Sequence, residues 1–149
     1  MNGLFATRSG FTGLVLRVFL AVVIFPHGAQ KVLGWFGGFG FTNTLNFFTN
    51  TMHVPAPLVL LVFAVEFLGP IGLFVGFLTR LAALGILVDM IGAIAIVHGH
   101  NGFFMNWMGK TPPAEGFEYH LLVIGMALAL ILGGAGELSV DKAIAGDGA

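Results

Sequence analysis

Four long apolar stretches run along this 149-residue chain, and short segments rich in glycine, proline and polar residues separate them. The stretches cover residues 11–33, 56–78, 81–98 and 117–134. A helix of about 20 apolar residues crosses the hydrocarbon layer of a bilayer, so each stretch is predicted to be a transmembrane helix. We therefore expect an all-α, polytopic membrane protein, a four-helix transmembrane bundle that forms one domain over residues 1–149.

Residues 41–52, between the first and second spans, follow a different, amphipathic pattern. Threonine and asparagine residues lie opposite apolar residues that recur at helical spacing, namely Phe41, Leu45, Phe48 and Met52. This pattern predicts a short interfacial helix on the membrane surface with Thr42 as its N-cap, or alternatively a loop packed over the bundle. The polar residues that follow the fourth span are expected to form a mobile tail.

Composition narrows the class of protein. Only 9% of the residues are charged and 57% are hydrophobic, a balance that soluble globular domains of this size do not show. The absence of cysteine from the sequence excludes disulfides, thiol catalysis and cysteine-ligated iron–sulfur clusters. The net charge of −1 offers no basic surface to a nucleic acid, so membrane lipids are the surroundings that we expect.

The positive charges predict the orientation of the chain in the membrane. Arg8, Arg80 and Lys142 fall on one side of the predicted bundle, whereas Lys31 and Lys110 fall on the other. Since lysine and arginine accumulate in cytoplasmic segments, we expect both termini to lie in the cytoplasm.

Glu66 is a carboxylate near the middle of the second apolar stretch. An ionisable residue inside a membrane span is energetically costly, and it is a functional-site hypothesis by default. Pro70 follows four residues later and cannot donate a hydrogen bond to the backbone carbonyl of Glu66. One position thus combines a buried acid with an unpaired backbone acceptor.

The up-and-down topology places further polar residues at the same outer level of the bundle. They lie at the outer ends of the first, third and fourth spans: His27, Lys31, His98, His100, Glu118, Tyr119 and His120. Helical rise places Glu66 at a depth of roughly 13–15 Å from that side. We expect His27 or Lys31 to neutralise the Glu66 charge. In the inner half only Arg17 remains, with Asp89 near the midplane as its candidate partner.

Several interpretations of this outer cluster stay open. A quinone needs hydrogen-bond donors for its carbonyls and an aromatic-lined pocket, and His27, Glu66, His98 and Tyr119 lie among many phenylalanines. No His-x-x-x-His or Glu-x-x-His spacing occurs, so we predict no metal site, and a haem with two facing histidines is disfavoured. A proton or solute path would use Glu66 and Asp89 as relay groups. The cluster could also be a satisfied polar network that only keeps the helices in register.

A set of residues in both halves of the chain recurs in the order and spacing of a known family. The first half contributes Arg17, Pro26-His27-Gly28 with Lys31, the Gly-Trp-Phe-Gly-Gly segment, Glu66 with Gly69, Gly72 and Gly76, and Thr79-Arg80. The second half contributes His98, Gly102-Phe103-Phe104, Glu118-Tyr119 and a closing Gly-x-Gly-x-x-Ser-x-Asp pattern that ends at Asp141. In these features, which cover nearly the whole chain, the sequence resembles the DoxX family of small bacterial membrane proteins.

The resemblance implies a four-helix protein of the bacterial inner (plasma) membrane. Some relatives, of the DoxD type, form the membrane part of a thiosulfate:quinone oxidoreductase, and others accompany redox or oxidative-stress partners. Because this chain has no cysteine and no cofactor motif, we do not expect it to be catalytic alone. A protein partner in a redox complex would supply the remaining chemistry.

The leading hypothesis is therefore a membrane subunit of a redox assembly that binds quinone in its outer half. Glu66 and His27 would be the catalytic, proton-handling pair. The residues expected to surround the cofactor are His98, Glu118, Tyr119 and Lys31. The alternatives are a non-catalytic scaffold that stabilises a larger complex, and a small proton-coupled carrier. Close-packing glycines on several spans also permit a homo-oligomer.

Overall fold

The computed structural model describes residues 3–109 and 114–146, and its secondary structure there is helical without strands. Three helices are long and apolar enough to cross a membrane: α1 (Thr12–Leu33), α3 (Ala56–Val75) and the continuous helix Thr79–Asn101. A fourth apolar helix, α5 (Glu118–Gly133), is shorter. The all-α prediction is confirmed, and the four helices lie within the predicted apolar stretches or start within two residues of them. Lys110, used in the orientation prediction, lies outside the described residues.

The helix Thr79–Asn101 changes its winding along its length. It begins as α4 (Thr79–Ala93), continues as a π-helical turn, η3 (Ile94–His98), and ends as a 3-10 turn, η4 (Gly99–Asn101). A Cβ atom at Gly99 would lie 2.7 Å from the carbonyl oxygen of Ile94, so this position needs a residue without a side chain. π-helical turns are rare and often occur at functional sites. Here the turn ends at His98, one of the predicted site residues.

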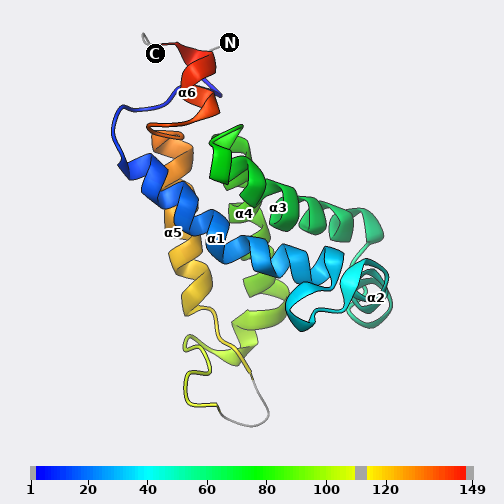
Figure 1. Ribbon diagram of the computed structural model, residues 1–149. Helices are drawn as coiled ribbons and strands as arrows, with labels where there is room; N and C mark the ends of the chain where they lie inside the picture. The colour runs from blue at the N-terminus through cyan, green and yellow to red at the C-terminus, as the bar shows by residue number, and fades with distance from the viewer. Residues whose placement is uncertain (1–2, 110–113, 147–149) are drawn as a thin grey trace.

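The apolar helices form two pairs, α1 with α3 and α4 with α5, which cross one another and share a common core (Figure 1). α1 contacts α3 and α5, and α4 also contacts α3 and α5. The core side chains come from all four helices: Leu20, Ile24, Leu73, Ile86, Met90, Val123 and Leu130. Large apolar side chains also cover the outside, among them Phe19, Leu68, Val88 and Leu122. Such an apolar exterior is suited to contact with lipid.

α1 and α3 touch at the level of the backbone. A Cβ atom at Gly28 would lie inside 3.0 Å of the carbonyl oxygen and carbon of Glu66 and the amide nitrogen of Phe67. The Glu66 carbonyl is the acceptor that Pro70, inside α3, leaves without its helical donor. Gly28 therefore fits α1 against the one turn of α3 whose backbone is altered by proline, and it brings the end of α1 next to Glu66.

α3 ends three residues before the predicted boundary at residue 78. Gly76 adopts a left-handed conformation (φ 70°), and the amide of Phe77 donates to the carbonyl of Gly72 over 2.8 Å. This is the hydrogen-bond pattern of a Schellman C-cap, which a glycine stabilises at low cost. Gly72 and Gly76 therefore serve the end of the helix, and α4 starts after a turn of three residues.

Residues 41–52 contain the predicted short helix. α2 (Gly40–Asn46) continues into a π-helical turn, η2 (Phe47–Thr51), beside the end of α1 and the start of α3 (Figure 1). The predicted N-cap at Thr42 is wrong, because the helix starts at Gly40 and has no side-chain cap. A short 3-10 turn, η1 (Trp35–Gly37), connects this helix to α1. Its position on a membrane surface stays a prediction.

The segment after α5 is not the mobile tail that its polarity predicts. It folds back, forms the short helix α6 (Val140–Ala145), and packs at the end of the molecule where the first and last described residues lie (Figure 1). The buried carboxylate of Asp141 accepts hydrogen bonds from the amides of Leu78 (2.8 Å) and Thr79 (2.9 Å). These amides open α4, so Asp141 caps that helix from a distant part of the chain.

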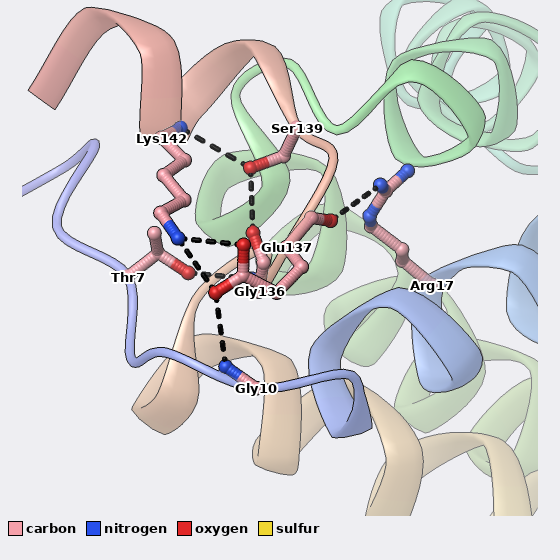
Figure 2. A network of polar contacts seen from close by, with 7 residues as sticks. All are labelled: Thr7, Gly10, Arg17, Gly136, Glu137, Ser139 and Lys142. Carbon is pink, nitrogen blue, oxygen red and sulfur yellow. Dashed lines mark hydrogen bonds and ion pairs between the residues drawn. The ribbon is translucent and has the colours of Figure 1, made fainter. Parts of the chain in front are cut away.

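The expected pairing of Arg17 with Asp89 is also wrong. The Arg17 side chain is 1% exposed and donates to backbone carbonyls where α3 ends and α5 leads into α6: Leu73, Phe74, Ala135, Glu137 and Leu138. Figure 2 shows the hydrogen bond from Arg17 to the Glu137 carbonyl beside the Glu137–Lys142 ion pair. Helix ends leave carbonyls without partners, and one guanidinium group carries five N–H donors. Arg17 thus satisfies carbonyls from two segments.

Candidate functional site

The site is centred on an ion pair between Lys31 and Glu66. Lys31 lies in the last turn of α1 and donates to the Glu66 carboxylate in the middle of α3. Glu66 is only 6% exposed, whereas the Lys31 side chain remains partly exposed. The expectation that Lys31 neutralises Glu66 is confirmed. The close approach of α1 to α3 at Gly28, one turn before Lys31, makes this pairing geometrically natural.

A second carboxyl group, from α4, joins this ion pair. Asp89 lies beside Glu66, within hydrogen-bonding reach of its carboxyl group, and also interacts electrostatically with Lys31. Its Oδ2 atom is buried and has no hydrogen-bond partner among the described residues. α1, α3 and α4 therefore each contribute one charged side chain to the same point in the interior.

Aromatic and imidazole rings continue from this point along α5. The ring centroids of His27 and Tyr119 are 6.4 Å apart, those of Tyr119 and His120 are 5.5 Å apart, and those of His120 and His98 are 4.2 Å apart. His120 is 5% exposed, and neither its Nδ1 nor the hydroxyl oxygen of Tyr119 has a hydrogen-bond partner in the part of the chain that the structure describes. The rings therefore connect α1, α5 and the π-helical turn.

Backbone contacts fix the orientation of His98. Its Nδ1 lies 2.8 Å from the carbonyl oxygen of Glu115, and because a carbonyl can only accept, Nδ1 carries the proton. The side-chain amide of Asn101 donates to the same carbonyl over 3.1 Å. In the neutral ring, Nε2 is then left as a hydrogen-bond acceptor.

Glu118, predicted to join the cofactor-binding set, lies apart from the cluster. Its Oε1 accepts from the amide of Met105 (2.8 Å) and from the indole N–H of Trp107 (2.6 Å). The backbone amides of Gly116 and Glu118 also donate to carbonyls of the 102–104 segment. Glu118 therefore fixes the shape of the outer loop, whose Trp107 and Met108 side chains point into the surroundings and are 80% and 86% exposed.

An apolar groove of about 420 Å³ lies between α1 and α5 and ends at the ring cluster. Its α1 side includes Val15, Phe19 and Val23, spaced four residues apart, and His27 is the next residue in that series. On α5 the groove is lined by Tyr119, Leu122, Val123 and Met126. The groove therefore offers an apolar surface that reaches Tyr119, whose ring lies next to that of His27.

Sequence reasoning placed one part of this site incompletely and missed another. It gave Asp89 to Arg17 as a candidate partner and linked it to Glu66 only in the proton-path alternative, whereas the structure places Asp89 beside Glu66. It also overlooked the groove, for which the spacing of Val15, Phe19, Val23 and His27 was the available signal. Of the predicted site residues, the structure brings together Glu66, Lys31, His27, Tyr119 and His98, either directly or through His120. Their roles in catalysis and binding stay predictions.

Comparison with known proteins agrees with the resemblance. The family model described as DoxX matches residues 12–99, which run from α1 into η4 and include all three charged side chains of the site. Across 117 residues the chain is 32% identical to a protein of Bacillus subtilis (strain 168) named "Putative oxidoreductase CatD", covering 78% of this chain and 76% of that protein. No solved structure matches the chain. The protein therefore belongs to the DoxX family.

Proposed function

We propose that this protein is a membrane subunit of a redox assembly and binds a quinone, or a similar lipid-soluble carbonyl compound, in the groove between α1 and α5. The observation that carries the proposal is the groove itself, which is apolar along its length and ends beside a polar cluster. A prenyl tail suits the apolar stretch, and a polar ring suits its end. The relative's name as an oxidoreductase supports a redox role.

In this proposal α5 also crosses the bilayer, which completes a four-helix transmembrane bundle in the bacterial inner membrane. α5 has 16 residues and is apolar, and it packs between α1 and α4. A span of this length is short but within the range that local bilayer thinning accommodates. Arg8, Arg80 and Lys142 belong to the end where α6 packs, which favours a cytoplasmic location of that end.

The residues at the end of the groove have chemistry that fits a quinone ring. Tyr119 lines the groove, and its hydroxyl is buried without a partner among the described residues, so a ligand carbonyl would supply the missing acceptor. His27 is exposed at the same level and can donate to a second polar atom. A bound quinone would accept two electrons from the partner subunit together with two protons. The Glu66–Lys31 pair interacts electrostatically with His27, and Glu66 also interacts with Tyr119.

A pair of neighbouring valines provides the test. Val23 lines the groove between α1 and α5, whereas Val22 lines a different apolar groove between α1 and α3. Both are exposed, so phenylalanine should be tolerated at either position. The protein in nanodiscs is titrated with decylubiquinone, and Val23→Phe is expected to weaken binding at least tenfold while Val22→Phe leaves it unchanged. Equal effects of both variants, or no binding by the unmodified protein, would contradict the proposal.

A scaffold role is the second candidate, and the outer loop favours it. Trp107 and Met108 are almost fully exposed, and the contacts of Glu118 hold the loop in one shape. Exposed aromatic and methionine side chains on a fixed loop are typical of binding surfaces for other proteins. Stoichiometric recovery of a partner that depends on Trp107 but not on Glu66, without decylubiquinone binding, would support this role over the first.

A further inference from the structure

Two carboxyl groups and one ammonium group meet inside the helix bundle. Lys31 pairs with Glu66, and Asp89 approaches Glu66 from the opposite helix, α4. Glu66 is buried, and the Oδ2 atom of Asp89 is buried without a partner among the described residues. Two carboxylate oxygens cannot hydrogen-bond to one another unless one of them carries a proton.

The charges in the neighbourhood do not balance if both acids are ionised. The groups that interact electrostatically with the pair are Lys31 and His27 from α1 and Tyr119 from α5. The ring of His120 lies next to Tyr119, and the ring of His98 lies next to His120. With neutral imidazole and phenol rings, Lys31 supplies one positive charge against two negative charges. Arg17 cannot contribute, because it is bound to carbonyls at the opposite end of the bundle. Like charges held together in a low-dielectric interior strongly favour uptake of one proton.

We propose that Glu66 and Asp89 share one proton, so that Asp89 is the second half of a proton-holding site next to Lys31. The shared proton brings the three groups to zero net charge and supplies a hydrogen bond between the two carboxyl groups. His120 is 5% exposed and lies beside Tyr119, and its Nδ1 has no hydrogen-bond partner within the described part of the chain. This region therefore retains unused hydrogen-bonding capacity.

In the proposed function, the shared proton would be the one donated to the quinone, and this use of the proton rests on the proposed function. Glu66 interacts electrostatically with both His27 and Tyr119, the groups at the end of the groove. When the shared proton moves to an oxygen of a bound quinone that receives electrons from the partner subunit, Glu66 and Asp89 are left as two carboxylates beside Lys31. A proton taken up from the aqueous phase then restores the pair, and a second transfer of the same kind supplies the second proton that reduction to the hydroquinone requires. Asp89 does not touch the ligand in this scheme and acts through Glu66.

The test measures the proton itself and needs no quinone. Infrared spectra of the full chain in nanodiscs, compared in H₂O and D₂O at neutral pH, are expected to show the carbonyl stretch of a protonated carboxyl group. Asp89→Asn and Glu66→Gln should each remove that band, because the remaining acid can pair fully with Lys31. Glu137→Gln, which changes an ionised surface carboxylate paired with Lys142, is the matched control and should leave the band in place.

The outcomes separate this inference from the proposed function. Absence of the band from the unmodified protein, or its persistence in Asp89→Asn, overturns the shared proton whether or not decylubiquinone binds. If a variant fails to fold, the unmodified protein still decides: raising the pH should remove the band with the loss of one proton per chain. If the band is present but decylubiquinone does not bind, the two carboxyl groups share a proton as proposed, but they do not donate it to a quinone.

Discussion

Both ends of the helix bundle bury charged side chains, but they use them differently. At the end where α6 packs, here called the Arg17 end, Arg17 donates to five backbone carbonyls and Asp141 accepts from two backbone amides. Arg80 donates to the carbonyls of Ala6, Ile131 and Leu132. At the Glu66 end, defined by Lys31, Glu66, Asp89, His27, Tyr119, His98 and His120, charged groups and rings face one another.

The two ends differ in the groups that the charged side chains contact. Backbone groups at helix ends cannot change protonation or move away, so a side chain that binds them serves the fold. At the Glu66 end, Asp89 Oδ2, Tyr119 Oη and His120 Nδ1 lack partners in the described chain, whereas the comparable exception at the Arg17 end is Thr79 Oγ1. Unsatisfied buried groups cost stability and occur where a site binds or transfers something. We therefore assign a structural role to the Arg17 end, and the Glu66 end is where the proposed proton and quinone chemistry would take place.

The largest effect is expected from removing the Arg17 guanidinium. Arg17→Met leaves buried carbonyls of α3 and the 135–138 segment without donors, and hydrogen bonds to charged groups contribute about 1.5–3 kcal/mol each. We expect the free energy of unfolding to fall by roughly 3 kcal/mol or more, and the midpoint of thermal unfolding in detergent to fall strongly. Arg8→Met, at an exposed position nearby, is the control. Equal midpoints for both variants would refute the architectural role of Arg17.

The two ends also differ in how much of their structure the sequence predicts. Apolar length alone predicts the four helices, because lipid-facing and core-facing positions are both apolar. The spacing of His27 and Lys31, one turn apart, with a single acid in the next span, predicts their proximity to Glu66. These features depend on side-chain types at fixed spacing, which a sequence displays directly.

The remaining features depend on information that residue types do not carry. The partners of Arg17 are backbone carbonyls, which are present at every residue and therefore produce no pattern. Asp141 docks on the start of α4 from about 60 positions away, so the polarity of its segment wrongly indicates mobility. The placement of Asp89 depends on the rotation of α4 about its axis, which no nearby polar residue in α4 reveals.

A smaller loss of stability is expected when the close contact between α1 and the Glu66 backbone is disturbed. In Gly28→Ala the new methyl group meets the Glu66 carbonyl inside 3.0 Å, and backbone atoms on both sides must shift. Overpacking of this kind costs about 1–3 kcal/mol, and it should also weaken decylubiquinone binding because Lys31 and Glu66 separate. Thermal unfolding and ligand titration measure the two effects.

Gly125 on α5 provides the control for this substitution. Among the described residues, no atom outside the neighbouring backbone of α5 lies within 4 Å of a Cβ atom at that position. Gly125→Ala should therefore stabilise the helix slightly, by up to about 1 kcal/mol. If Gly28→Ala behaves like Gly125→Ala in both measurements, the close approach of α1 and α3 does not position the Glu66 end.

The smallest expected effect is a pH dependence of thermal stability that arises from Glu137 at the surface of the Arg17 end. Hydrogen bonding to the Lys142 ammonium, and then to the Gly10 amide, lowers the pKa of Glu137 below its usual value of 4.5 (Figure 2). A lowered folded-state pKa stabilises the fold above the unfolded-state pKa, and this contribution disappears as the pH falls through the folded-state value. The midpoint difference between the unmodified protein and Glu137→Gln should therefore be present at neutral pH and vanish in acid. Other carboxyl groups titrate in both proteins and cancel from the difference. A difference that stays constant with pH would show that Glu137 acts through its shape alone, and the ion pair would then add nothing to the architecture of this end.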